Sequence, residues 1–166
     1  NLLRAMLAAG LENAAFATLA DPVAVGQARA AGEGALLDLT LGGRHAPELT
    51  PPLAVRARVL RLHDGAYRCA GPVLRGVEVQ MGPAALLEIA GIRVVVASRA
   101  LAVTDVALFH ALGMDPATFT TLALKSRNHH RAAFGPLARE VLLVDAGGIA
   151  TMQLGGVGYR NLRRPI

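Results

Sequence analysis

The sequence predicts a mixed α/β domain, and three observations lead to that expectation. Apolar residues recur at helical spacing near the start of the chain and again around 104–112. Between about 35 and 98, apolar and polar residues alternate as they do in strands. Helix–strand units on both sides of this stretch predict an antiparallel, strand-rich middle section inside a two-layer or three-layer α/β fold.

The first unit combines two helices with one strand. In chain order we expect a helix over 3–10, a strand over 14–20 and a helix from 22 to 32. Asp21-Pro22 favours the second helix start, because aspartate accepts bonds from free backbone N–H groups and proline has no N–H to leave unused. Gly32 is expected to end that helix.

The middle section is expected to be an antiparallel sheet with one exposed face. The expected strands cover 37–41, 55–59, 77–81, 84–89 and 92–97. Asp64-Gly65 and Ala90-Gly91 are turn signals between consecutive runs, and the first predicts a hairpin. The segment 42–52 holds three prolines and is expected to be a loop.

The last part of the chain returns to helix–strand order. We expect a helix capped by Thr104 or Asp105, a turn at Asp115-Pro116, a strand over 120–124, a helix capped by Ser126 or Asn128 that runs to about Phe134, and a strand over 140–145. A glycine-rich and then basic tail covers 146–166. We interpret 1–166 as one domain of a larger protein.

Composition excludes several classes of function. No run of about 20 apolar residues is present, so no membrane helix is expected. The formal charge is +5, but the arginines are scattered and aromatic residues are only 4% of the chain, so we expect no nucleic-acid partner. Cys69 is the single cysteine, which excludes an intrachain disulfide and a cysteine-based zinc site and agrees with a cytoplasmic location.

The segment from Lys125 to Arg131 is the strongest candidate for contact with a substrate. A strand followed by Lys125-Ser126 and a helix would place free backbone N–H groups at the carboxyl edge of a sheet. Arg127, His129 and Arg131 add charge or hydrogen-bonding groups, so the segment could bind a carboxylate, a phosphate or a developing oxyanion. The alternative is that Ser126 is only a helix cap and the charged side chains are solvated.

Familiar catalytic and metal-binding motifs are absent from the sequence. Lys125-Ser126 resembles the end of a phosphate-binding P-loop, but Leu122-Ala123-Leu124 stands where such a loop needs glycine. There is no HExxH, and His129 and His130 are neighbours that a helix would point about 100° apart. We therefore expect no metal site and no assigned catalytic residue in this chain.

Three other residues have both a functional and a structural interpretation. His45 lies in a glycine-rich loop and either reaches a neighbouring domain or is solvated. Asp21 and Asp145 follow expected strands and could line a cleft, although helix capping is the stronger interpretation of Asp21. Cys69 is expected to be a packed thiol rather than a nucleophile.

Several motifs in register are similar to one protein family. The segment 125–134, KSRNHHRAAF, resembles the KSxxHFRAAF signature in the C-terminal domain of microcystinase C (MlrC)-like metallopeptidases. The similar pieces, in chain order, are Asp21-Pro22, LGGRH at 41–45, Ser98-Arg99, GMDP at 113–116, Val144-Asp145 and YRNLRRPI at 159–166. The chain departs from the family pattern at His130, where the family usually has phenylalanine, and at 146–148.

The resemblance implies a role in a zinc-dependent hydrolase of peptide or amide bonds. It implies that residues 1–166 are the C-terminal fragment of a larger two-domain protein whose N-terminal domain holds the zinc and the catalytic carboxylate. The C-terminal fragment would then close the cleft over a peptide or amide substrate. Lys125, Ser126, His129 and Arg131, with His45, would then position the substrate, and the fragment alone would be inactive. The alternative is a non-catalytic interdomain or dimerisation scaffold, which would include a homo-oligomer. Nucleic-acid binding by Arg160, Arg163 and Arg164 is a further alternative.

Overall fold

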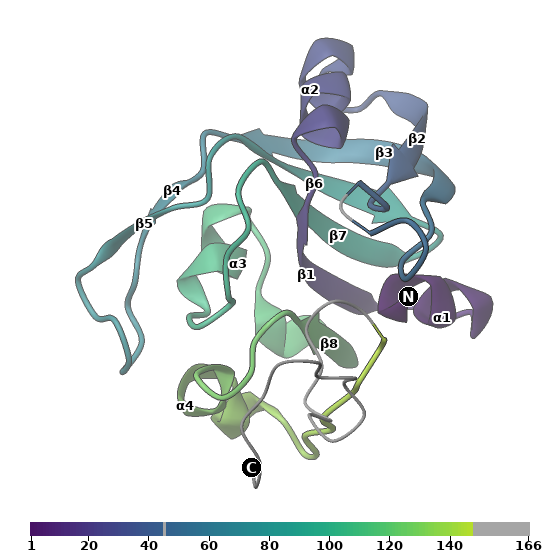
Figure 1. Cartoon of the computed structure of the whole chain (residues 1–166). Coiled ribbons are helices and arrows are strands. Elements are labelled where there is room, and N and C mark those ends of the chain that lie inside the picture. The colour runs from purple at the N-terminus through teal and green to yellow at the C-terminus, as the bar shows by residue number, and fades with distance from the viewer. Residues whose placement is uncertain (45, 148–166) are drawn as a thin grey trace, which may run out of the picture.

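The computed structural model describes residues 1–44 and 46–147, and its centre is a twisted mixed sheet (Figure 1). The strands of this sheet are β1 (Ala14–Ala20), β2 (Leu36–Leu41), β3 (Leu53–His63), β6 (Ala84–Ile89), β7 (Ile92–Ala97) and β8 (Thr121–Leu124). Their order is β2-β3-β6-β7-β1-β8. β1 runs parallel to β7 and β8, whereas the other neighbours pair in antiparallel fashion. The sheet therefore combines an antiparallel half with a parallel half.

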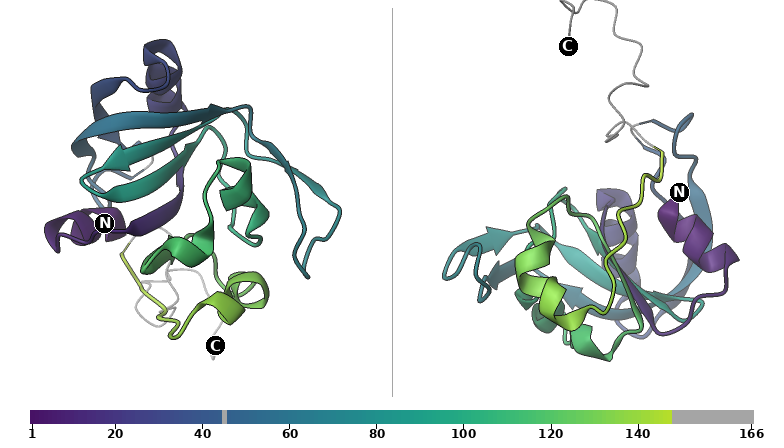
Figure 2. Two further views of the ribbon diagram at one scale, coloured as in Figure 1. Left: turned by 180° about the vertical axis from the view of Figure 1, so that it is seen from behind. Right: turned by 90° about the horizontal axis from the view of Figure 1, so that it is seen from below.

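Helices cover both faces of the sheet, which makes the fold three-layered. Helices α1 (Leu2–Ala8) and α2 (Pro22–Ala31) pack into one hydrophobic core. Helices α3 (Ala107–Ala111) and α4 (His130–Phe134) pack into the other, together with a short ribbon of β4 (Ala66–Arg68) and β5 (Glu78–Gln80). The ribbon projects from the body in both Figure 1 and Figure 2. The predicted mixed α/β class is confirmed.

The central strands are buried on both faces, which the alternation pattern did not predict. Val94 and Val96 point into the α1–α2 core, while Val95 and Ala97 point into the α3–α4 core. The predicted exposed face is therefore wrong for β6 and β7, because α3 and the ribbon cover it. It holds at β2 and β3, where Arg56 and other alternate side chains are exposed.

The start of α2 follows the predicted capping chemistry. The Asp21 carboxylate accepts a hydrogen bond from the backbone N–H of Ala24 at 3.1 Å, and Pro22 fills the first helical position. Gly32 ends the helix with a positive φ of 84°. The short 3-10 helix Pro116–Thr118 begins in the same way, with Asp115 as its cap.

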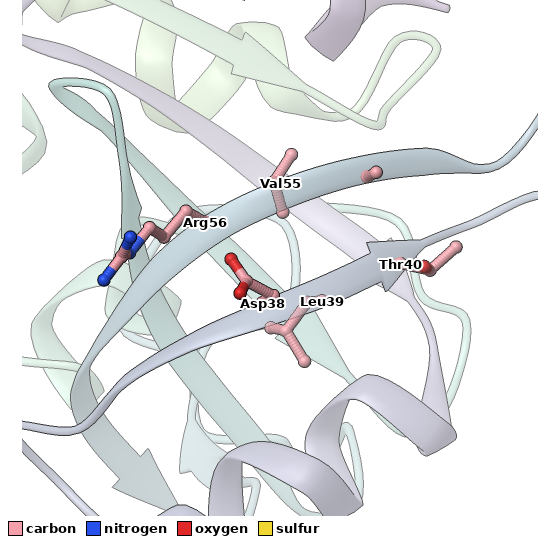
Figure 3. A pocket seen from close by; sticks show the side chains of 6 residues that line it. Asp38, Leu39, Thr40, Val55 and Arg56 are labelled. Atoms are coloured by element: carbon pink, nitrogen blue, oxygen red, sulfur yellow. The ribbon is translucent and has the colours of Figure 1, made fainter.

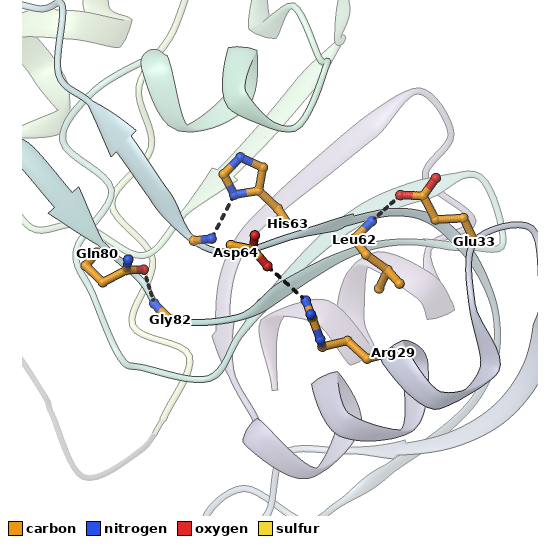
Figure 4. A network of polar contacts seen from close by, with 8 residues as sticks. Arg29, Glu33, Leu62, His63, Asp64, Gln80 and Gly82 are labelled. Atoms are coloured by element: carbon orange, nitrogen blue, oxygen red, sulfur yellow. Dashed lines mark hydrogen bonds and ion pairs between the residues drawn. The ribbon is translucent and has the colours of Figure 1, made fainter.

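Asp64-Gly65 is a turn, but the hairpin predicted there is wrong. β3 pairs with β2 and β6, whereas β4 pairs only with β5 within the described residues. The turn is fixed by local contacts instead: Asp64 pairs with Arg29 of α2 at 3.5 Å, and the Gly65 N–H donates to His63 Nδ1 at 2.9 Å (Figure 4). The Gly65 carbonyl accepts from Met81 N, which lies next to the Ala66–Gln80 pair of the β4–β5 ribbon.

The chain after α4 does not form the strand predicted over 140–145. This segment has no ladder partner in the described part of the chain, and its apolar side chains Leu142, Leu143 and Val144 are 73%, 63% and 59% exposed. It leads back to the start of α1, where Asn1 Nδ2 donates to the carbonyl of Ala146 at 2.8 Å. Among the described residues, no helix is both long and apolar enough to span a membrane. The basic tail, apart from its first two residues, lies outside the described residues.

Candidate functional site

The carboxyl ends of the three parallel strands bring together segments that are far apart in sequence. β7 ends at Ala97, β1 at Ala20 and β8 at Leu124, and each strand is followed by polar residues. The Asp21 N–H donates to the Ala97 carbonyl at 2.9 Å, which joins the ends of β1 and β7. In open α/β sheets this edge is where ligands bind, since loops diverge there and leave a crevice.

Lys125 leaves this edge on a backbone that is held from both sides. Its N–H donates to the Ala17 carbonyl of β1 at 2.6 Å, and its carbonyl accepts from Val103 N at 3.0 Å. Thr18, next along β1, donates its hydroxyl to the Leu101 carbonyl at 3.4 Å and so joins the same loop to the strand. The Lys125 side chain is exposed, so a fixed backbone presents a mobile positive charge to solvent.

Asp21 connects a second loop to this edge. Besides capping α2, its carboxylate accepts from the Gly42 N–H at 2.9 Å and from Arg44 Nε at 2.7 Å. The Asp21 side chain is fully buried, while that of Arg44 is 36% exposed. Burial alone would raise the pKa of Asp21, but the hydrogen bonds from Arg44, Ala24 and Gly42 outweigh burial, and the pKa lies below its usual range.

The Asp21–Arg44 pair was not predicted from the sequence, although both residues lie in motifs that the sequence analysis identified. Asp21 was interpreted as a helix cap or a cleft residue, and the glycine-rich loop was singled out for His45. The available signal in the sequence was an aspartate after an apolar strand and a later glycine-rich loop that carries one arginine, Arg44. His45 itself lies outside the described residues.

The segment after Lys125 differs from the prediction. α4 begins only at His130, and neither Ser126 nor Asn128 caps it with its side chain. A stretch without helical structure therefore separates β8 from a helix of five residues. The expected row of free N–H groups at a strand-to-helix junction is absent at Lys125, because the chain first turns before the helix can start.

Two buried polar atoms in this segment have no hydrogen-bond partner among the described residues. They are Ser126 Oγ and His130 Nδ1, and the His130 side chain is only 8% exposed. Unpaired buried polar groups are uncommon, because each carries a desolvation cost that no bond offsets. Each of the two atoms therefore carries a desolvation cost in the folded chain.

The remaining predicted residues lie around these two atoms in sequence but face solvent. His129 and Arg131 are both exposed, whereas His130 between them is buried. The expectation that His129 and His130 point apart is therefore confirmed. Burial, with a smaller effect from the Arg131 charge, lowers the pKa of His130, so this imidazole is neutral at pH 7.

The described residues do not offer a metal site. No three histidine, cysteine, aspartate or glutamate side chains gather within residues 1–44 and 46–147. Cys69 is a buried thiol whose pKa is raised by burial and further by Asp105. Asp105 is itself engaged, since it accepts from Gly71 N at 2.7 Å and from Ala107 N at 2.9 Å. Cys69 is thus a packed thiol, as predicted.

Two surface hollows lie away from the predicted residues. One of about 370 Å³ lies over β2 and β3, between Asp38, Thr40 and Arg56 (Figure 3). The other, of about 250 Å³, lies between Arg61, Arg93 and the end of α3. Neither hollow is lined by Lys125, Ser126, His129 or Arg131. These four predicted residues therefore belong to neither hollow.

Comparison with known proteins agrees with the motif pattern. The family model described as MlrC C-terminus matches residues 1–161. Microcystinase C from Sphingomonas sp. is 30% identical over 143 residues, which is 86% of this chain and 27% of that protein. A crystal structure of a proposed metallopeptidase from Mesorhizobium sp. BNC1 superimposes with a TM-score of 0.75 and 30% identity, over 83% of this chain and 28% of that one. This chain thus belongs to the MlrC C-terminus family and spans about a quarter of the length of these relatives.

Proposed function

We propose that this chain is the accessory C-terminal domain of a zinc-dependent peptidase or amidohydrolase located in the cytoplasm. It closes the cleft of a larger N-terminal domain and positions a peptide or amide substrate. The family match supports the class of protein, and the two relatives are described as a microcystinase and a metallopeptidase. Because the chain spans only 27% and 28% of their lengths, most of such a protein would lie outside it.

The observation that carries this proposal is the arrangement around Lys125. Its backbone is fixed by bonds to Ala17 and Val103, and its ammonium group is exposed at the carboxyl edge of the parallel strands. Ser126 Oγ and His130 Nδ1, both unpaired, follow within the same segment. An exposed positive charge on a fixed backbone suits a substrate that carries a carboxylate or develops negative charge on oxygen.

The proposal divides the work between this chain and the rest of the protein. The described residues do not fit a zinc ion, since no set of ligands converges. As the resemblance to MlrC-like metallopeptidases implies, we assign the metal and the catalytic carboxylate to the N-terminal domain. The side chains of this chain bind the substrate, orient it and hold its negative charge. His129 and Arg131 are exposed to solvent and contact the substrate from the surface.

Substitution of Lys125 in the longer protein tests this role. We expect Lys125→Ala to lower kcat/KM for peptide hydrolysis by about tenfold to a hundredfold, since a charged hydrogen bond is worth about 1.5–3 kcal/mol. Arg56→Ala is the matched control, because Arg56 is an exposed positive residue on β3, outside this edge. An unchanged kcat/KM in a folded Lys125→Ala protein would refute the substrate role.

A second candidate function is a scaffold that joins domains or copies of the protein. The exposed apolar run Leu142, Leu143 and Val144 favours it, because such a run is characteristic of a surface that another body covers. On this interpretation, Lys125→Ala would leave turnover unchanged. Leu143→Asp would instead weaken association, measured by sedimentation.

A further inference from the structure

We propose that Arg44, held in place by Asp21, is the residue that recognises a carboxylate group of the peptide substrate, with Asp21 as its positioning residue. The inference rests on the proposed function for the kind of substrate, but the binding event itself requires no hydrolysis. It starts from an ion pair that the sequence analysis did not predict.

The geometry leaves one side of the Arg44 guanidinium available. Arg44 Nε donates to Asp21 Oδ1 at 2.7 Å, whereas neither Nη group makes a hydrogen bond with the described part of the chain. The Arg44 side chain is 36% exposed, although the carboxylate that holds it is fully buried. The two Nη groups of a guanidinium offer parallel N–H donors that match the two oxygens of a carboxylate.

The loop that carries Arg44 is fixed before any ligand arrives. The Gly42 N–H donates to Asp21 Oδ2 at 2.9 Å, one residue after the end of β2. At Gly43 the backbone has a φ of +69°, and a Cβ there would lie 2.6 Å from Pro52 N. The loop backbone is therefore held between Asp21 and Pro52, and the bond from Nε restrains the Arg44 side chain. Less conformational entropy remains to be lost when Arg44 binds a ligand.

The charge balance also favours an anion at this place. Asp21 is the N-cap of α2 and accepts bonds from two backbone N–H groups besides Arg44. The amides and the positive end of the ten-residue helix compensate much of its negative charge. Asp21 therefore does not depend on Arg44 alone, which agrees with a ligand binding to Arg44 as well.

A titration of the 166-residue chain with N-acetylglycine tests the inference. We expect a saturable shift of the Arg44 Nε–Hε signal and of the Gly42 amide in ¹⁵N NMR spectra. N-acetylglycinamide, which lacks the carboxylate, is the matched ligand and is expected to cause no saturable shift. Inorganic phosphate is a second comparison: tighter binding of phosphate than of the carboxylate would contradict the assigned ligand class.

Variants separate recognition by Arg44 from general attraction of anions. Arg44→Gln is expected to weaken N-acetylglycine binding about tenfold to a hundredfold, measured at the Gly42 amide signal. Arg44→Lys keeps the charge but loses the paired donors, so its affinity is expected to lie between those of the parent and Arg44→Gln. Arg56→Gln removes the same charge from β3 and is expected to leave binding unchanged. Asp21→Asn is expected to weaken binding with Arg44 still present and to speed hydrogen exchange of Nε–Hε.

Equal shifts with the acid and the amide, or unchanged affinity in Arg44→Gln, would overturn this inference. That result is distinguishable from failure of the proposed function. If the carboxylate does not bind at Arg44 but Lys125→Ala still lowers turnover of the longer protein, only the role of Arg44 is wrong. If the carboxylate binds at Arg44 and Lys125→Ala has no effect on turnover, recognition by Arg44 stands and the proposed role of Lys125 fails.

Discussion

Asp21 joins helix α2 to the loop after β2 through a single carboxylate. It caps α2 at Ala24, holds the loop after β2 at Gly42 and anchors Arg44. A buried carboxylate is tolerated only when its bonds are complete, and here the three donors are sufficient to lower its pKa. The sequence predicted the capping role because that role depends on neighbouring residues. The contacts with Gly42 and Arg44 span 21 and 23 residues and depend on the twist of the whole sheet.

His130 illustrates the opposite case, a buried polar group without a partner. Its pKa is lowered, so the folded state keeps it neutral at a pH where the unfolded chain would bind a proton. Above an unfolded pKa of about 6.5, the imidazole is neutral in both states and contributes no pH dependence. As the pH falls below that value, the unfolded state gains the proton first and the folded state loses stability.

The His130→Phe variant tests this account at the scale of one residue. At pH 7 we expect the free energy of unfolding to rise by about 1 kcal/mol, because an unpaired buried nitrogen is removed. The advantage of the variant should grow as the pH falls from 6.5, measured by urea denaturation at several pH values. A variant that is less stable than the parent at pH 5.5 would show that His130 Nδ1 has a partner in solution.

Elements whose signals are local were predicted well. The strands over 14–20, 84–89 and 92–97 and the helix from 22 coincide with the structure. The errors concern strand partners, the strand predicted over 140–145, which does not form, and the start of one helix. The hairpin at Asp64-Gly65 and the strand at 140–145 both failed because pairing depends on distant segments. The short α4 likewise begins later than its capping residues suggested.

The loop between β2 and β3 provides a test at the scale of an element. Gly43→Ala should lower the free energy of unfolding by about 1–3 kcal/mol, since a Cβ would enter the left-handed region and approach the Pro52 backbone. Gly26→Ala is the matched control, because Gly26 lies in α2 and a Cβ there meets no atom within 4 Å.

The control should move in the opposite direction. Alanine favours a helix over glycine by about 1 kcal/mol, so Gly26→Ala is expected to stabilise the chain. Thermal denaturation of both variants measures the difference. Equal effects of the two substitutions would show that the loop is not held between Asp21 and Pro52.

At the scale of the whole molecule, the three-layer fold gathers chemistry at one edge of its sheet. The carboxyl ends of β7, β1 and β8 lie side by side in the parallel half of the sheet. The loop after β2 also reaches this edge, where Gly42 N–H donates to Asp21. We propose that the candidate residues of this edge bind and position a substrate; the described residues offer no set of metal ligands. The exposed run Leu142–Val144 gives the molecule a further surface for contact with another body.

Hydrolysis of a peptide substrate by the 166-residue chain alone, with zinc added, tests the central claim most directly. We predict no zinc-dependent hydrolysis and no stoichiometric zinc in a chain whose circular dichroism shows it to be folded. The longer protein, assayed under the same conditions, is expected to hydrolyse the peptide. Zinc-dependent turnover by the chain alone would contradict the division of labour proposed for this domain.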